Sequence, residues 1–136
     1  MKIDYMLDEG AFAPERAHEW DAGFDLRTPH MISIKSGSMV KVDTGVHFQF
    51  RNAVGMVKSK SGLNARGIQC EGVIDAGYTG PVMAVLYNHG ERTITFMPGD
   101  KITQIVFIEL PKIEMNKVDS LHETERGDGG FGSSGR

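Results

Sequence analysis

The sequence predicts an all-β fold, a jelly roll or a barrel, from three observations. Short apolar runs recur along the chain and are separated by turn residues. In residues 41–50, K-V-D-T-G-V-H-F-Q-F, polar and apolar residues alternate, which is the period of a strand with one buried face. The other runs are rich in valine, isoleucine and phenylalanine, which fit a pleated, half-buried surface. About eight short strands in one small domain are typical of jelly rolls and barrels.

The expected strands follow one another with turn signals between them. In chain order they are residues 31–34, 39–50, 56–58, 72–74, 82–87, 93–97 and 102–110. Two segments depart from this pattern: residues 14–20 are expected to form a helical turn, and residues 61–66, S-G-L-N-A-R, a short helix. Ser61 is expected to cap the short helix, and Gly67 stands where a glycine commonly ends one.

The chain is expected to consist of one domain with a body and a C-terminal arm. With 136 residues it can bury roughly two thirds of its unfolded surface. Residues 1–110 hold all the expected strands, whereas residues 111–136 become polar and end in R-G-D-G-G-F-G-S-S-G-R. Such a segment has too little apolar area to order its own backbone. We expect an arm that is mobile until a ligand holds it; the alternative is a disordered Gly/Ser tail with no function.

Composition limits the partners and the compartment. The net charge of −3 provides no broad basic surface, so a small polyanion is favoured over a nucleic acid. The five histidines are scattered without metal-ligand spacing, which argues against structural zinc. The single Cys70 rules out an internal disulfide and is expected as a buried apolar residue. No apolar run is long enough to span a membrane and no signal peptide is recognisable, so a cytoplasmic protein is expected.

The segment 72–80, G-V-I-D-A-G-Y-T-G, predicts a hairpin with Asp75 at its mouth and Tyr78 at its return. Backbone groups of such a hairpin can read the edge of a planar base, and Tyr78 can present its ring face to a sugar. Asp75 is then placed to take a proton from water. The alternative, with about equal weight on these residues alone, is an Asx turn stabilised by Asp75 with Tyr78 in the core.

Two further segments and the arm carry groups that suit phosphates. In K-S-K-S-G-L, residues 58–63, a strand runs into a helix N-terminus, where Lys60, Ser61 and Gly62 add a charge, a hydroxyl and room for close approach. A plain capped surface helix with solvated lysines is the alternative. In G-D-K-I-T-Q, residues 99–104, Gln104 could bond phosphate or water. In the arm, Arg126 can fork onto phosphate oxygens and Phe131 can lie on a ring.

Together with A-G-F-D-L-R at residues 22–27, these segments form five motifs in a fixed order. The chain thereby resembles the trimeric deoxyuridine triphosphatase (dUTPase) family over residues 22–135. The resemblance implies a jelly-roll-like homotrimer with active sites shared between subunits. It also implies hydrolysis of dUTP to dUMP and pyrophosphate with Mg²⁺, which limits uracil incorporation into DNA and supplies dUMP for dTMP synthesis.

The resemblance also implies a role for each motif residue. Asp75 would activate the water that attacks the α-phosphorus, Tyr78 would pack on the deoxyribose, and Asp25 would lie in the second shell of the metal, through water. The base would be read by backbone groups between Gly72 and Met83, including Gly72, Val73, Ile74 and Met83, with Gln69 nearby. The phosphates would be held by Lys60, Ser61, Gly62 and Gln104. From the arm, Arg126 would clamp the γ-phosphate, Phe131 would cover the uracil, and Gly132, Ser133 and Ser134 would close over the phosphates.

Three residues depart from the common family pattern, and they bear on substrate affinity more than on the type of reaction. Lys60 replaces a common arginine by a point charge, Thr79 also stands where arginine is common, and Asp128 adds a negative charge to the arm. A deoxycytidine triphosphate deaminase, which has the same fold, would need a glutamate in the strand after the hairpin, where this chain has Val85. The fold alone also allows a non-enzymatic nucleotide-sensing or protein-binding module on the same scaffold. The presence together of Asp75, Tyr78, Arg126 and Phe131 argues against that alternative. Release of pyrophosphate from dUTP would distinguish these alternatives.

Overall fold

The computed structural model describes residues 1–132 and residue 135 of the chain. Within these residues the fold consists of nine strands and one short helix, so the expected all-β class is confirmed. The elements are β1 (Asp4–Leu7), β2 (Gly23–Arg27), β3 (Ile32–Ile34), β4 (Met39–Gln49), β5 (Ala53–Lys58), α1 (Ser61–Asn64), β6 (Ile68–Asp75), β7 (Pro81–Asn88), β8 (Ile94–Phe96) and β9 (Lys101–Glu109).

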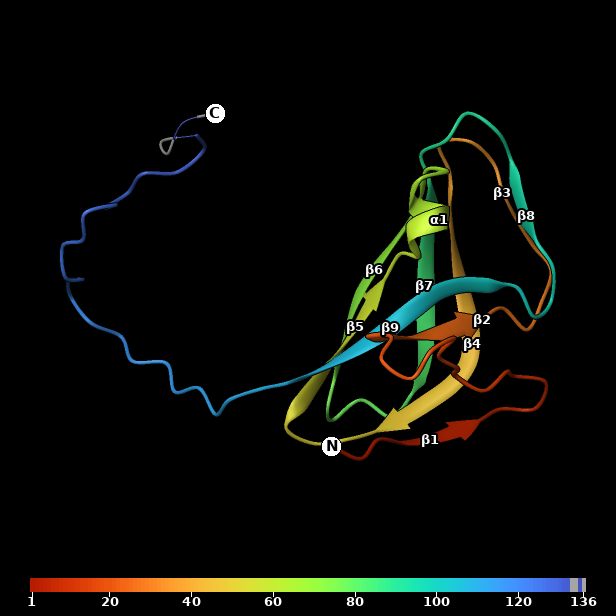
Figure 1. The fold of residues 1–136 in the computed structure, drawn as a ribbon, viewed down its shortest axis with the longest axis horizontal. Helices are drawn as coiled ribbons and strands as arrows, with labels where there is room; N and C mark the ends of the chain where they lie inside the picture. The colour runs from red at the N-terminus through yellow and green to blue at the C-terminus, as the bar shows by residue number, and fades with distance from the viewer. Residues whose placement is uncertain (133–134, 136) are drawn as a thin grey trace.

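Seven of these strands form one curled antiparallel sheet in the order β1-β4-β7-β6-β5-β9-β2, and β3 pairs with β8 in a separate ribbon. Strands far apart in sequence are neighbours in this sheet: β5 pairs with β9, and β9 with β2. Figure 1 shows the sheet wrapping around an interior, with α1 at one end of β5 and β6 and the β6–β7 connection at the other. This arrangement fits the expected jelly-roll-like barrel.

Alternating side chains of the strands fill the interior. In β7 the buried positions are Val82, Ala84, Leu86 and the polar Asn88, and in β4 they include Val42, as the period-two pattern predicts. Phe107 meets the rings of Phe48 and Phe50 edge to face, at 5.2 and 5.1 Å between centroids.

Cys70 is 1% exposed within the same core, which confirms it as a buried apolar residue. Burial raises the pKa of its thiol, so the neutral form is favoured.

Several local expectations were wrong or incomplete. Residues 14–20 form no helical turn; instead the backbone of Glu15 pairs with Asp25, so β2 draws this segment into an extended bridge. Strands β1 and β2 were not expected from the sequence. All four residues of β1 are exposed, so it carries no alternation signal, and the charges of Asp25 and Arg27 mask the buried character of β2.

The helix α1 is confirmed, but its cap is not the one expected. Ser61 is its first residue, and the N-cap position is held by Lys60, which makes no side-chain capping bond. Gly67 follows the helix with a φ of +84°, and a Cβ there would lie 2.6 Å from the backbone nitrogen of Gly90. Both facts require glycine at this position.

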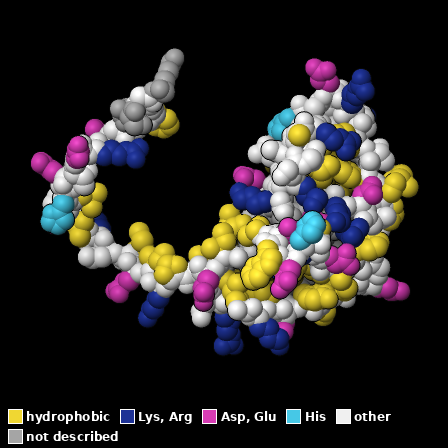
Figure 2. All heavy atoms as spheres, viewed as in Figure 1, with side chains coloured by type: hydrophobic (Ala, Val, Ile, Leu, Met, Phe, Trp, Pro, Cys, Tyr) yellow, Lys and Arg dark blue, Asp and Glu magenta, His cyan; other side chains and the backbone are white. Residues whose placement is uncertain are grey.

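Beyond β9 the chain leaves the sheet as an extended arm, coloured blue in Figure 1. Its first residue, Leu110, donates its N–H to the carbonyl of Asn52 at 2.8 Å. Figure 2 shows apolar side chains along the arm; Ile113, Met115, Val118 and Leu121 are all at least half exposed. These exposed apolar side chains make the arm less uniformly polar than we expected from the sequence. No helix within the described residues is long and apolar enough to cross a membrane.

Candidate active site

Three sequence motifs meet where β2, β9 and β5 lie side by side. Asp25 on β2 is opposite Gln104 on β9, and Gln104 is opposite Lys58 on β5. We call the group Asp25, Lys60, Lys101 and Gln104 the lysine–aspartate cluster. The sheet order thus brings together residues that are separated by up to 79 positions in the sequence numbering, from 25 to 104.

Asp25 is the centre of this cluster. The residue is 6% exposed. Its carboxylate accepts a hydrogen bond from Lys101 Nζ at 2.7 Å and another from Lys60 Nζ. Burial by itself would raise the pKa of Asp25, but the hydrogen bonds and charges of Lys101 and Lys60 outweigh burial and hold the pKa below its ordinary value. Asp25 is therefore an ionised group that positions two lysines. Sequence reasoning missed Lys101, although it lies within the G-D-K-I-T-Q motif.

Gln104 ties the cluster to the start of α1. Its Nε2 donates to the carbonyl oxygen of Ser59 at 3.0 Å, which fixes the backbone just before Lys60. Gly23 makes room for this side chain, because a Cβ at Gly23 would lie 2.2 Å from Gln104 Oε1. Ser61 and Gly62 are exposed beside it, and a Cβ on Gly62 would meet open space. The turn at residues 60–62 is accessible to a ligand.

The second group of motif residues lies at the hairpin between β6 and β7. These strands pair only from Ile68 to Cys70 on β6. Beyond Cys70, β6 pairs with β5, up to Asp75 opposite Val54, and its edge toward β7 has no ladder partner among the described residues. The hairpin is therefore open, and unpaired backbone donors and acceptors line the gap.

Asp75 and Tyr78 lie at the tip of this open hairpin. Asp75 is exposed, its carbonyl accepts the N–H of Tyr78 at 2.9 Å, and its carboxylate has no hydrogen-bond partner among the described residues. Tyr78 is 42% exposed and donates its hydroxyl to the carbonyl of Pro81 at 3.0 Å. Gly80 lies under this ring, since a Cβ there would be 2.5 Å from the tyrosine oxygen. The alternative of an Asx turn with Tyr78 in the core is therefore wrong.

The two groups lie at opposite ends of the β5–β6 ladder. Asp75 pairs with Val54 at one end, and Glu71 pairs with Lys58 at the other. At about 3.3 Å per residue, these ends are roughly 13 Å apart, and Lys60 lies beyond the second end. Figure 1 shows the same separation between α1 and the β6–β7 connection. Gln69 belongs to the α1 end, where its Oε1 is 3.1 Å from His89 Nε2.

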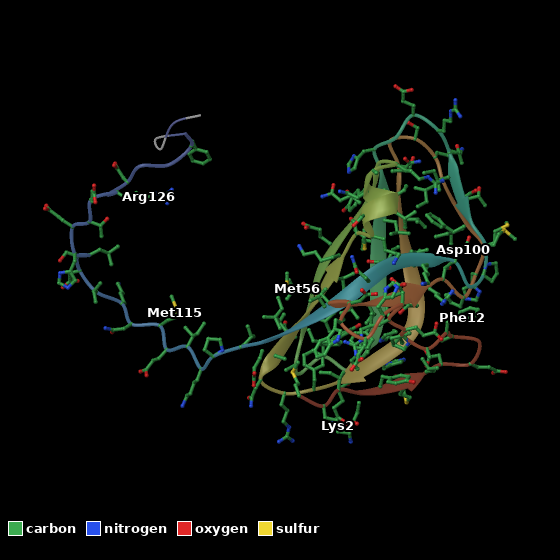
Figure 3. The ribbon with its side chains drawn as sticks, viewed as in Figure 1. Lys2, Phe12, Met56, Asp100, Met115 and Arg126 are labelled. Carbon is green, nitrogen blue, oxygen red and sulfur yellow. The ribbon has the colours of Figure 1, made fainter. Side chains whose placement is uncertain are left out.

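A third group of motif residues lies in the arm, away from both the lysine–aspartate cluster and the hairpin. Arg126 Nε donates to the carbonyl of Gly129 at 3.0 Å, and Gly127 N–H donates to Thr124, so the contacts of this turn are internal to the arm. Figure 3 shows Arg126 well away from the body that holds Met56 and Asp100. Phe131 is fully exposed. Ser133 and Ser134, expected to close over phosphates, lie outside the described residues.

Replacing Asp25 by asparagine tests the lysine–aspartate cluster through stability. We expect Asp25→Asn to lower the free energy of unfolding by about 2 kcal/mol at pH 7, because two partly buried lysines lose their counter-charge. A carboxyl with a lowered pKa stabilises the fold above its ordinary pKa of 3.8 and loses that effect as the pH falls through the folded value. Urea titrations should show the difference between the two proteins shrinking below pH 3.8. A difference that stays constant down to pH 3 would contradict this role.

The fold and the site define a small all-β protein with an open hairpin, a lysine-bearing turn at α1 and a glycine-rich arm. Comparisons with known proteins specify the class. The family model described as dUTPase matches residues 10–135. A deoxyuridine 5'-triphosphate nucleotidohydrolase of Nocardia farcinica is 38% identical over 95% of this chain and 82% of its own length. A deoxyuridine 5'-triphosphate nucleotidohydrolase of Clostridium tetani is 35% identical over 96% of this chain and 94% of its own length. The chain belongs to the dUTPase family.

Solved structures agree on the fold. A mutant of the Staphylococcus bacteriophage 80alpha dUTPase with dUpNHpp superposes with a TM-score of 0.92 at 23% identity, over 99% of both chains. A dUTPase from phage phi11 of S. aureus, described with a structural Mg(II) ion, superposes with a TM-score of 0.81 at 23% identity, over 88% of this chain and 98% of that one. The expected jelly-roll-like dUTPase barrel is confirmed.

Proposed function

We propose that this protein hydrolyses dUTP to dUMP and pyrophosphate, in homotrimers whose active sites are shared between subunits. The observation that carries the proposal is the open β6–β7 hairpin, with the ring of Tyr78 held beside the exposed Asp75 at its tip. The carboxylate of Asp75 has no hydrogen-bond partner among the described residues. Membership of the dUTPase family supports the substrate. In a cell, such an enzyme limits uracil incorporation into DNA and supplies dUMP.

Asp75 is the catalytic base in this proposal. Its carboxylate accepts a proton from a water molecule, whose oxygen attacks the α-phosphorus. The bond from the α-phosphorus to the bridging oxygen then breaks, and pyrophosphate leaves with the electron pair. Because this carboxylate has no hydrogen-bond partner among the described residues, both of its oxygens are free to accept from water.

The hairpin provides base and sugar recognition. Backbone groups of Gly72, Val73 and Ile74, together with Met83 across the gap, present an edge that can pair with the uracil ring. The exposed face of Tyr78 packs on the deoxyribose and leaves no room for a 2′-hydroxyl. Gln69 lies at the far end of the same strand, so in our proposal it serves a neighbouring site rather than the hairpin of its own chain.

The turn at α1 and the arm hold the phosphates. Lys60 has three N–H donors, so it can keep its bond to Asp25 and still donate to a phosphate oxygen. Ser61, Gly62 and Gln104 line the same turn. Arg126 supplies a bidentate donor for the γ-phosphate, Phe131 covers the base, and Gly132 approaches the phosphate chain.

The donor set fits a magnesium ion that is bound mainly by substrate. The described residues contain no group of three or more His, Cys, Asp or Glu side chains that could hold a metal. Mg²⁺ commonly keeps several waters and is held by phosphates with one or two carboxylates. Asp25, ionised and beside the phosphate turn, is the carboxylate that would bond such waters. When bound, the ion would neutralise charge on the triphosphate.

The separation within one chain supports sharing of sites between subunits. Asp75 and Lys60 lie at opposite ends of a ladder, so in our proposal the α1 end of another copy holds the phosphates of a substrate bound at the hairpin. Residues 111–125, at about 3.3 Å each, could reach roughly 50 Å, which exceeds the radius of a domain of this size. The arm can therefore reach a neighbouring site. We also propose that the enzyme acts in the cytoplasm, on free nucleotide and not on nucleic acid.

A substrate panel tests the proposed function. Pyrophosphate release should be at least about 100-fold faster, as kcat/KM, for dUTP than for dCTP, dTTP or UTP. Tyr78→Ala should raise the relative rate with UTP, whereas Tyr78→Phe, which keeps the ring, should preserve the preference. Ammonia release from dCTP would instead indicate a deaminase. Equal rates with all four nucleotides would contradict the proposal.

A further inference from the structure

His47 lies on β4 with both ring nitrogens bonded to acceptors from different parts of the chain. Nδ1 is 2.8 Å from the carbonyl oxygen of Thr79, and Nε2 is 3.1 Å from both carboxylate oxygens of Asp8. The His47 side chain is 16% exposed and that of Asp8 is 52% exposed, so the ring is sheltered from water but its carboxylate partner is not. Thr79 directly follows Tyr78 in the open hairpin, whereas Asp8 lies between β1 and β2. One imidazole thus connects the hairpin tip to the far edge of the sheet.

Both bonds can exist together only in the protonated ring. A backbone carbonyl and an ionised carboxylate only accept hydrogen bonds, so each ring nitrogen must carry a hydrogen. The neutral ring carries only one, and loses either the bond to Thr79 or the bond to Asp8. Bonding to the Thr79 carbonyl, and then to Asp8, raises the pKa of His47 above its ordinary value of 6.5 despite partial burial. The imidazolium therefore persists to a higher pH than in a histidine without these bonds.

Local backbone geometry fixes His47 and Asp8 in this arrangement. The β4–β7 register shifts between Asp43 and His47, and the register resumes with His47 opposite Pro81. Such a bulge re-aims the side chains that follow it. The N–H of Asp8 donates to the carbonyl of Gly45 at 2.8 Å, within the bulge. Asp8 is therefore held by the β4 backbone, independently of the hairpin.

Other charged groups around the ring act in the same direction. Asp43, on the same strand, adds a negative charge that favours the imidazolium. A surface cavity of about 230 Å³ borders the ring, and its titratable lining groups besides His47 are Asp4 and Tyr5 on β1. Asp4 is paired with Lys2 at 2.9 Å. From the hairpin the group facing the ring is the uncharged carbonyl of Thr79.

We propose that protonated His47 is a positioning residue that holds the hairpin tip, and with it Tyr78 and Asp75, in the conformation needed for turnover. The link is short: Thr79 adjoins Tyr78, and Tyr78 N–H is bonded to the carbonyl of Asp75 at 2.9 Å. Loss of the proton frees Thr79 in part of the molecules and lets the tip move. Activity then falls as the pH rises through the raised pKa of His47. This inference rests on the proposed function of the hairpin.

Two near-isosteric substitutions separate the two bonds of the ring. The amide nitrogen of asparagine can take the place of Nδ1 and donate to Thr79, whereas that of glutamine takes the place of Nε2 and can reach only Asp8. At pH 7 we expect His47→Asn to keep kcat for dUTP within about twofold and His47→Gln to lower it about tenfold. The wild type should lose about tenfold in kcat between pH 6 and 9, while His47→Asn should show no such loss.

His18→Asn is the matched control, since His18 is an exposed histidine paired only locally with Asp21. It should keep the pH profile of the wild type. A purely structural role of His47 would make both variants lose activity in proportion to their melting temperatures, with the alkaline loss unchanged. That result, or equal kcat values for His47→Asn and His47→Gln, would overturn the proposal. Titration of the uracil itself would appear equally in every variant.

Amide exchange separates a failure of this inference from a failure of the proposed function. If the wild type releases no pyrophosphate from dUTP at any pH, the proposed function is wrong. Exchange at residues 77–80, corrected for its intrinsic pH dependence, then decides the positioning role. Protection that falls with rising pH in the wild type, but not in His47→Asn, supports it. Protection that does not respond to pH, or to either substitution, overturns it.

Discussion

Asp75→Asn should lower kcat for dUTP by at least about 10²-fold while substrate still binds. The amide keeps the size of the carboxylate but cannot take the proton from the attacking water. The side chain is exposed and has no hydrogen-bond partner among the described residues, so its replacement removes no packing or bonding within the chain. Measurement of pyrophosphate release under single-turnover conditions isolates the chemical step, and a melting curve checks that the fold is kept.

Glu71→Gln is the matched control for this substitution. Glu71 is exposed on the same strand, four residues before Asp75, and pairs with Lys58 at 2.8 Å on the surface. The same loss of one negative charge there should change kcat by less than about twofold, because exposed ion pairs contribute little. Near-normal turnover by Asp75→Asn, or equal losses in both variants, would refute the assignment of the base.

Mixing two inactive forms of the protein should restore activity if sites are shared. One form carries Asp75→Asn and the other lacks residues 126–136. In randomly mixed trimers, half of the chains offer an intact Asp75 and the other half an intact arm. If a site takes these parts from different chains, about a quarter of the sites are complete. Co-refolded mixtures should therefore recover about a quarter of the wild-type activity.

Each form refolded alone serves as the control, and native mass spectrometry confirms that mixed trimers are present. The deletion should leave the melting temperature almost unchanged, since the hydrogen bonds of Arg126 and Gly127 stay within the arm. If each chain closes its own site, no mixture contains a complete one. If activity remains at the level of the separate forms although mixed trimers are present, the shared-site model is wrong.

Local patterns were sufficient for most of the strands, and failed where burial depends on distant charges. The alternation in β4 and β7 could be recognised because most of their buried residues are apolar, with Thr44 and Asn88 as the buried polar ones. Strand β2 was not legible, since its buried Asp25 is acceptable only with Lys60 and Lys101 beside it. Strand β1 is held by its ladder to β4 and buries none of its own residues, so no pattern marks it.

Hydrogen-bond partners far away in sequence could not be anticipated. His47 lies 39 residues from Asp8 and 32 from Thr79, and nothing near it in the sequence indicates that both ring nitrogens are bonded. Lys101 was overlooked for a similar reason, because its partner Asp25 is on another strand. The expected cap of α1 was wrong for a more local reason. Lys60 holds the N-cap position, directly after Ser59, whose carbonyl accepts a bond from Gln104, so the helix begins at Ser61.

The amino-acid sequence by itself determined the all-β class, the hairpin with Asp75 and Tyr78, the phosphate-binding residue types and the family. These features depend on period, turn chemistry and short motifs, all of which act between near neighbours in the chain. The tertiary structure alone decided which motifs meet: strand order unites Asp25 with Lys60 and Gln104, and leaves Asp75 at the other end of the ladder. Pairing between distant strands is set by the summed burial of the whole sheet, which no single segment encodes.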